Sequence, residues 1–253
     1  INNDKVVNDV KRESENVELI CDKTLFYAES GGQVGDSGSI YNLQENLVAL
    51  VSDTQVIENN IYIHTLNNIT EEIKVNEIYK LVVDKGRRNK IRNNHSATHL
   101  LHESLRIVVG PHVTQKGSLV NEEKLRFDYT STEQLTNDQI HKIESLVNTS
   151  IRSNISSNIK LMPVKQAVQS GAIALFGEKY PDNVRVISLI DKNKKNISSV
   201  ELCGGTHVDT TGQIGFFKIL NESSVSSGIR RVEAITGEVA EKYVTEKIIM
   251  LDN

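Results

Sequence analysis

Two pairs of potential metal ligands, far apart in the sequence, constrain what this chain can fold into more than any other feature. His95 and His99 lie four residues apart within residues 87–109, where apolar residues recur at helical intervals. Residues at this spacing project from one face of a helix, so both imidazoles can reach a single ion. Cys203 and His207 are also four residues apart and lie more than 100 residues downstream. A fold that brings the two pairs together would create a four-ligand site.

The residues between Cys203 and His207 favour such a site. Two of the three are glycines, which allow a turn tight enough for both side chains to face one point. Three imidazole nitrogens and one sulfur favour Zn²⁺ in tetrahedral geometry. Either pair alone fits ordinary structural residues equally well, and the metalloprotease motif that the first pair partly matches has Glu where this chain has Ser96. Taken together, the pairs predict one Zn²⁺ per chain, bound by His95, His99, Cys203 and His207.

Composition narrows the class of protein. The chain has 253 residues, of which 38% are hydrophobic and 25% charged, so it can bury a substantial core. No apolar run approaches the roughly 18–20 residues that cross a bilayer, which argues against a membrane protein. The two cysteines, Cys21 and Cys203, exclude a disulfide scaffold and fit a reducing cytoplasm. Because the first residue is Ile1, we expect the chain to be a piece of a longer protein.

The net charge of −4 hides a strong asymmetry along the chain. Residues 1–84 hold 6 Lys and Arg against 15 Asp and Glu, a net charge of −9. Residues 85–253 hold 23 against 18, a net charge of +5. Because an acidic surface repels a polyanion, any nucleic acid is expected to bind the second part of the chain.

The pattern of apolar residues predicts an α+β fold with two main domains. Short alternating runs before Asp84 predict a small β-barrel or sandwich. Downstream, helical patterns alternate with short strands, and a further helix follows Gly237. We expect a small acidic β-barrel-like domain over residues 1–84, a zinc-binding α+β domain over 85–240, and the start of a C-terminal helix over 241–253. The expected strands are 17–27, 40–56, 61–66, 79–83, 113–120, 124–129, 159–164, 184–190, 216–220 and 229–235, and the expected helices are 87–109, one after Thr136, and 165–170.

A glycine-rich segment, residues 30–38, lies between two of the expected strands. Tight turns with positive φ would explain it without any function. A backbone surface free of side chains, able to approach a ligand closely, would explain it equally well.

Five ordered motifs occur in the chain. They are His95-Ser-Ala-Thr-His99-Leu-Leu-His, Gly110-Pro-His-Val-Thr-Gln115-Lys-Gly-Ser, Glu201-Leu-Cys203-Gly-Gly-Thr-His207-Val, Phe26-Tyr-Ala-Glu-Ser-Gly-Gly-Gln-Val-Gly-Asp and Gly228-Ile-Arg-Arg-Val-Glu-Ala-Ile-Thr-Gly. These motifs resemble the editing domain of alanyl-tRNA synthetases and, for the motif at Phe26, the small β-domain before it. The resemblance extends from about Val17 to about Ala240, and free-standing editing proteins related to this family share its histidine and cysteine motifs.

The resemblance implies hydrolysis of the ester that joins a wrongly attached serine or glycine to alanine tRNA. It also implies that the four histidine and cysteine residues bind the zinc and that Gln115 lies in the editing pocket as a catalytic residue. Without the resemblance, Gln115 would be taken as a solvated strand-end residue. The implied partners are mischarged tRNA(Ala) and the remainder of a cytoplasmic synthetase chain. No ATP-binding signature is visible, so we expect no aminoacylation by this piece.

Contacts with tRNA are expected from the distribution of charge and from the glycine-rich segment. Cations just before the metal histidines could grip phosphates, although a charge run on a helix is usually a solvated face. Lys192, Lys194 and Lys195 are interpreted as loop residues, and His64, His102, His112 and His141 as structural or solvated. The candidate substrate or tRNA contacts are Gly31, Gly32, Gln33, Lys85, Arg87, Arg88, Lys116, Arg230 and Arg231.

Two alternatives stay open. One is a free-standing deacylase that edits in trans. The other is a non-catalytic tRNA-binding module in which zinc only stabilises the fold, because four protein ligands would complete a tetrahedral site and leave no position for water. No general base stands within the motifs, so that role is unassigned.

Overall fold

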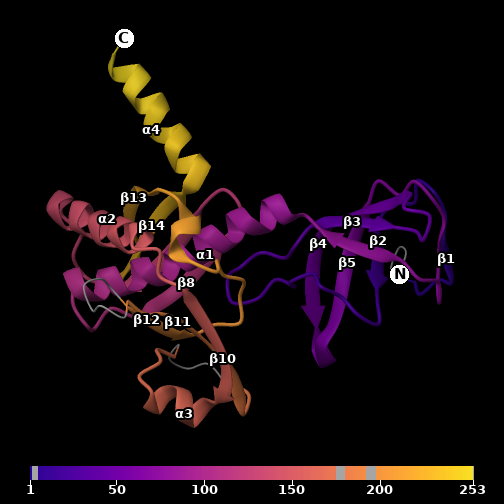
Figure 1. The fold of residues 1–253 in the computed structure, drawn as a ribbon, viewed down its shortest axis with the longest axis horizontal. Helices are drawn as coiled ribbons and strands as arrows, with labels where there is room; N and C mark the ends of the chain where they lie inside the picture. Colours follow the sequence, from indigo (N-terminus) through magenta and orange to yellow (C-terminus); the bar gives the residue numbers. More distant parts are fainter. Residues whose placement is uncertain (2–4, 175–179, 192–197, 253) are drawn as a thin grey trace. The chain divides into compact units, whose positions relative to one another are not determined.

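The computed structural model describes residues 1, 5–174, 180–191 and 198–252. Packing divides the chain into two compact units (Figure 1). The first contains residues 1–30 and 34–88, and the second contains residues 31–33 and 89–253. Residues 31–33 of the glycine-rich segment therefore pack with residues that follow them by more than 50 positions in the sequence. Lys192, Lys194 and Lys195 lie outside the described residues.

Five antiparallel strands form the main sheet of the first unit, in the order β2-β5-β4-β3-β7. A separate two-stranded sheet pairs β1 with β6, and a short 3₁₀ helix over Glu58–Asn60 connects β4 to β5. The strands are β1 (Asp9–Val10), β2 (Val17–Ile20), β3 (Gly38–Tyr41), β4 (Leu47–Ile57), β5 (Ile61–Asn67), β6 (Ile73–Lys74) and β7 (Lys80–Val83).

The predicted barrel is wrong, because this sheet is open. Among the described residues, the edge strands β2 and β7 each pair with one neighbour in the sheet and not with each other. The apolar face is covered without closure, since Val10 of β1, Ile73 of β6 and Phe26 pack into the same core as Ile40 and Val51. Once other segments bury that face, curling the sheet into a barrel is not needed to exclude water.

Two further antiparallel sheets build the second unit. One has four strands in the order β13-β14-β9-β8, and the other has three in the order β10-β11-β12. Leu125, Phe127 and Tyr129 of β9 are fully buried, as their alternation in the sequence predicted. The strands are β8 (Gln115–Val120), β9 (Leu125–Thr130), β10 (Ser157–Pro163), β11 (Asn183–Leu189), β12 (Ser199–Leu202), β13 (Phe217–Ser226) and β14 (Ile229–Thr236).

Helix α1, Lys85–Val108, positions the first pair of candidate ligands. Its residues 94–102 are all buried, so this part of the helix is enclosed on every side despite its polar sequence. Thr98 and Ser104 satisfy their hydroxyls by donating to the carbonyls four residues earlier, at 2.8 and 2.7 Å. A polar helix segment that is enclosed in this way must satisfy its polar side chains within the protein.

The remaining helices belong to the second unit. Thr136 and Gln139 form a reciprocal capping box at the start of α2, and Ile143, Val147 and Ile151 of this helix are buried. Helix α4 projects away from β13 and β14, and Ala240 is its buried residue (Figure 1). No helix in the described ranges combines the length and apolar character needed to cross a membrane. These elements are α2 (Asn137–Arg152), α3 (Val164–Gln169), α4 (Gly237–Leu251) and a 3₁₀ helix over Thr211–Ile214.

The mixed helix and strand content expected from the sequence is confirmed, and each predicted segment overlaps an observed element. The expected strand 40–56 overlaps two strands, β3 and β4. Strands β1, β6 and β12 were not predicted, and β1 and β6 have only two residues each, too few to show periodicity. The domain boundary at residue 84 stays a prediction.

Candidate metal centre

The four predicted metal ligands converge in the second unit. The ligand atoms offered by His95, His99, Cys203 and His207 all lie within 4.8 Å of one another. The Cys203 sulfur is 3.3 Å from Nε2 of both His95 and His207. Ligands of a tetrahedral zinc ion are separated by about 3.3–3.6 Å, given Zn–N and Zn–S bonds of about 2.0–2.3 Å. The donor atoms are therefore close enough to share one ion.

Helix α1 holds the two histidines as their spacing predicted. The His95 and His99 rings are stacked, with centroids 5.3 Å apart and an interplanar angle of 14°. Both side chains are buried, at 7% and 6% exposure. The first pair is therefore preorganised by the helix itself.

The second pair lies on the loop that follows β12, and two arginines hold this loop. Arg185 of β11 donates to the carbonyls of Cys203, at 3.1 Å, and of Gly205. Arg92 of α1 donates to the His207 carbonyl and pairs with Asp209 at 2.9 Å. Neither arginine was predicted to support the site, because nothing local in the sequence shows which carbonyls they reach.

Glycine is required at one of the two loop positions, for reasons of space. A Cβ atom on Gly205 would lie 2.0 Å from Cε1 of His95, whereas a Cβ on Gly204 would have no atom within 4 Å. The sequence argument therefore holds for Gly205, although the cause is the close approach of His95 and not a positive φ.

Each histidine turns its Nδ1 toward a partner outside the ligand set. His95 Nδ1 is 2.7 Å from Gln33 Oε1, and His99 Nδ1 is 3.0 Å from Glu201 Oε2. His207 Nδ1 is 3.4 Å from the Ser96 hydroxyl. Metal-binding histidines typically use their second nitrogen in this way, which leaves Nε2 for the ion.

The buried nitrogen of His99 supplies an independent test of fit. Among the described residues, neither ring nitrogen of His99 has a hydrogen-bond partner, although Nδ1 is 3.0 Å from Glu201 Oε2. Buried polar atoms are nearly always paired, so an orphaned imidazole nitrogen beside a sulfur and two other imidazoles fits a metal ligand. The donor set and this orphaned atom are both consistent with a divalent cation.

Glu201 is a site residue that sequence reasoning missed. It is buried at 5% exposure, and its second oxygen, Oε1, is 3.3 Å from His102 Nδ1 and accepts a hydrogen bond from Ser199 at 2.9 Å. His102 Nε2 has no hydrogen-bond partner among the described residues, and the interpretation of His102 as structural stays a prediction. Glu201 lies in β12, two residues before Cys203, and this short separation from a predicted ligand was the available signal.

Charges within the cluster shift its pKa values strongly. Burial raises the pKa of the Cys203 thiol, but the neighbouring histidines, His95 first, outweigh burial and hold it well below its usual range. Burial lowers the pKa of His99, but Glu201 and Cys203 outweigh it and raise the pKa to about 10. Burial and the charge of His95 lower the pKa of His207 to about 3. Burial would raise the pKa of Glu201, but His99 and His102 hold it below its usual range. The site therefore favours a thiolate, which is the form that binds metal.

In the glycine-rich segment, two glycines form a turn and Gln33 lies beside the metal centre. Gly31 and Gly32 have positive φ values of 59° and 86°, in agreement with the turn interpretation. Gln33 is fully buried and is one of the residues around His95. Direct contact of these three residues with tRNA stays a prediction.

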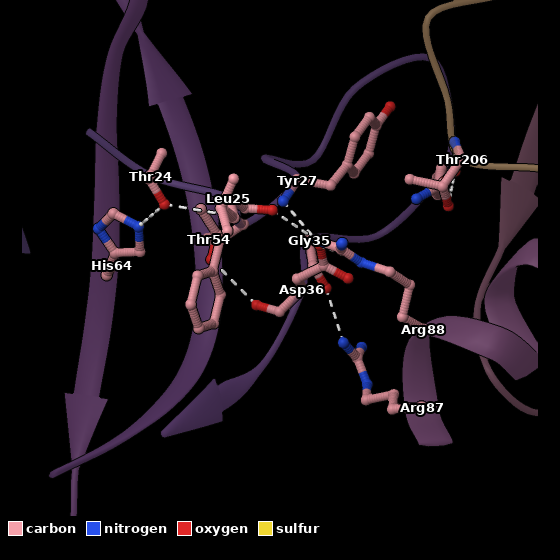
Figure 2. Close-up of polar contacts among 12 residues, drawn as sticks. Thr24, Leu25, Tyr27, Gly35, Asp36, Thr54, His64, Arg87, Arg88 and Thr206 are labelled. Carbon is pink, nitrogen blue, oxygen red and sulfur yellow. Dashed lines mark hydrogen bonds and ion pairs between the residues drawn. The ribbon is translucent and has the colours of Figure 1, made fainter. Parts of the chain in front are cut away.

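The first unit uses its candidate tRNA-binding arginines internally. Arg88 pairs with the buried carboxylate of Asp36, with Nε at 3.0 Å, and donates to the Leu25 carbonyl at 2.7 Å (Figure 2). Arg87 donates to the Gly35 carbonyl at 2.7 Å. Tyr27 donates its backbone N–H to Asp36 at 2.6 Å, so the carboxylate joins two chain segments. These contacts explain both arginines structurally, and a role toward tRNA stays a prediction.

The other candidates are scattered over their units. Arg230 pairs with Glu222, with Nη2 at 2.7 Å, and Arg231 pairs with Asp128, with Nε at 2.6 Å. Lys85 and Lys116 are exposed. Gln115 is half-buried at the start of β8, and its role in a pocket stays a prediction.

Two models of known protein families match parts of the chain. A family model described as "Threonyl and Alanyl tRNA synthetase second additional domain" matches residues 184–233, which include Cys203 and His207. A model described as "tRNA synthetases class II (A)" matches residues 1–87.

Two curated relatives match most of the chain. An alanine–tRNA ligase of Wolbachia pipientis wMel is 46% identical over 245 residues, covering 97% of this chain and 27% of that protein. An alanine–tRNA ligase of Parvibaculum lavamentivorans is 48% identical over 228 residues, covering 89% of this chain and 25% of that protein. The chain thus spans about a quarter of the length of these relatives. It belongs to the alanine–tRNA ligase family.

Proposed function

We propose that this chain carries the proofreading activity of an alanine–tRNA ligase and hydrolyses the ester of serine or glycine wrongly attached to tRNA(Ala). The observation that carries the proposal is the convergence of three imidazoles and one thiol within 4.8 Å in a member of this family. The match of residues 184–233 to a domain found in threonyl- and alanyl-tRNA synthetases supports it.

The chemistry of amino-acid selection explains why such an activity is needed. A pocket shaped for alanine cannot strongly reject glycine, which lacks one methyl group. It also discriminates weakly against serine, which adds one hydroxyl. A second site that hydrolyses the wrong products removes the errors that binding alone leaves.

The donor set favours zinc, because it combines three nitrogens with one sulfur. His95, His99, Cys203 and His207 would hold the ion. When bound, zinc supplies Lewis-acid chemistry toward an ester carbonyl or a water molecule. In this proposal the amide of Gln115 binds the substrate, and its two donors and one acceptor suit an ester or an aminoacyl group.

Two alternative functions are compared with this proposal. A complete set of four protein ligands is typical of structural zinc, which favours the non-catalytic tRNA-binding module. A free-standing deacylase would edit without a ligase, but the matched relatives are ligases about four times as long as this chain.

The test measures amino-acid release from seryl-, glycyl- and alanyl-tRNA(Ala) by the zinc-loaded chain. We expect serine and glycine to be released faster than alanine and faster than in buffer. Gln115→Ala should slow seryl release at least about tenfold while zinc content and thermal midpoint stay unchanged, in keeping with the loss of a substrate contact. Gln134→Ala, at an exposed position outside the site, is the matched control. Hydrolysis no faster than in buffer, with zinc and tRNA both bound, would support the module instead.

The tRNA-binding surface is proposed on charge alone. Lys85 and Lys116 present exposed ammonium groups, whereas Arg88, Arg230 and Arg231 already pair with carboxylates. Phosphate contacts from such lysines would make affinity depend on salt without reading sequence.

A further inference from the structure

The segment Gly31–Gln33 reaches the second unit by a backbone contact along β8. Val120 donates its N–H to the Gly32 carbonyl at 2.7 Å, and Gln33 forms a parallel bridge with Val120. A Cβ atom on Gly32 would lie 2.3 Å from the Ser118 carbonyl oxygen, and its φ is +86°. Glycine is therefore required for this approach, and the contact fixes where the next side chain, Gln33, enters the unit.

The chemistry of its neighbours determines which way the Gln33 amide points. Its Oε1 lies 2.8 Å from the backbone nitrogen of Thr206, a group that can only donate. The Thr206 hydroxyl also donates to Oε1, at 3.2 Å. The reversed amide would place two donors face to face, so the carbonyl oxygen must face Thr206.

This orientation determines the tautomer of His95. The same Oε1 atom is 2.7 Å from His95 Nδ1, and an acceptor at that distance requires a proton on Nδ1. A neutral imidazole with its proton on Nδ1 carries its lone pair on Nε2. That nitrogen is the one 3.3 Å from the Cys203 sulfur.

We propose that Gln33 is a positioning residue of the metal centre. One buried carbonyl oxygen holds His95 of α1 through Nδ1 and the 203–207 loop through Thr206, so it links the two halves of the ligand set. Gln33 is fully buried, which protects the three hydrogen bonds to its Oε1 from competition with water. The inference rests on the proposed metal centre and is independent of editing activity.

The experiment measures the zinc affinity of the chain by competition with a chelator, together with the visible absorption of its Co²⁺ form. Gln33→Met keeps the size of the side chain but removes the acceptor, and should weaken zinc binding about 10–100-fold, the effect typical of losing an outer partner of a ligand. Gln33→Glu keeps an acceptor at this position and should bind zinc at least about tenfold more tightly than Gln33→Met. The Co²⁺ absorption of the Met variant should differ from that of the unmodified chain.

Asn148 offers a matched control in the same unit. Its amide also bridges backbone groups: it accepts from the Phe217 N–H and donates to the Phe217 carbonyl, at 2.9 Å each. Among the described residues, its hydrogen bonds run to Glu144 and Phe217 and not to the metal cluster. Asn148→Leu should therefore lower the thermal midpoint and leave zinc affinity within about twofold, since an amide is lost without losing a ligand partner.

Three results would overturn the inference. They are a Met variant with unchanged affinity and Co²⁺ absorption, a Glu variant no better than Met, and an equal loss of affinity in Asn148→Leu. If Gln33→Met does not fold, imidazole ¹⁵N NMR of the unmodified zinc-loaded chain decides. Metal on Nε2 of His95 with a slowly exchanging Nδ1 proton supports the role, and metal on Nδ1 excludes it. Failure of the deacylation assay with these results intact would reject the proposed function and not the role of Gln33.

Discussion

His64 in the first unit and His99 in the second are both buried, but their ring nitrogens differ in whether they have hydrogen-bond partners. His64 has partners for both nitrogens. Its Nε2 is 2.7 Å from the Thr24 hydroxyl (Figure 2), and its Nδ1 is 3.0 Å from the Leu19 carbonyl. His99 has Glu201 at Nδ1, and among the described residues its Nε2 has no hydrogen-bond partner.

The difference shows what distinguishes a structural histidine from a candidate ligand. His64 lies edge-on to Phe26, with ring centroids 5.4 Å apart, and its hydrogen bonds are complete within its own unit. Completion of that kind needs no ion. An imidazole that is buried and unsatisfied on one side, among other donors, is stabilised by binding one.

Replacing the two histidines in turn should give the largest difference in zinc affinity between two variants. His99→Gln removes one of four ligands, so zinc affinity should fall by more than about 100-fold, beyond the range typical of an outer partner. His64→Gln should leave zinc affinity within about twofold and lower the free energy of unfolding by about 1–3 kcal/mol, because it disturbs buried hydrogen bonds. Chelator competition and denaturant unfolding measure the two effects. Equal losses of affinity in both variants would show that the distinction is wrong.

Replacing each of the two glycines of the 203–207 loop should give a smaller difference in zinc affinity. Gly205→Ala places a methyl group 2.0 Å from His95 Cε1, so that ring or the loop must move. Zinc affinity should fall at least about tenfold, because ligand geometry is displaced. Gly204→Ala meets no atom within 4 Å and should bind zinc within about twofold of the unmodified chain. A tolerant Gly205 would mean that the loop does not approach His95 as described.

The smallest expected effect is the pH dependence contributed by His64. Burial lowers its pKa below 6.5, and the Leu19 carbonyl offsets only part of this. The unfolded chain therefore takes up a proton near pH 6.5 while folded His64 stays neutral, so stability falls as pH drops below that value. The loss is at most about 1.4 kcal/mol per pH unit. Urea unfolding at pH 7.5 and 5.5 should show less acid sensitivity in His64→Gln than in the unmodified chain. Exposed His141→Gln should not change it.

Local patterns in the sequence predicted much of the fold. The helical spacing around His95 and His99 predicted α1, and Thr136 with Gln139 marks the capped start of α2. The open sheet of the first unit was mistaken for a barrel, because alternation reports which face is buried and not what covers it. Phe26 and the β1–β6 pair supply that cover, and their contribution depends on contacts between segments distant in sequence.

The candidate metal ligands could be identified from the sequence, because a helical turn and a short glycine-containing loop each bring two donors together by local geometry. The partners of those ligands were decided by tertiary structure. Gln33 is 62 residues from His95, and Ser96 is 111 residues from His207. No periodicity relates residues at such separations. Their contact follows from burial of the segments that carry them, and from the need to satisfy every polar atom that burial removes from water.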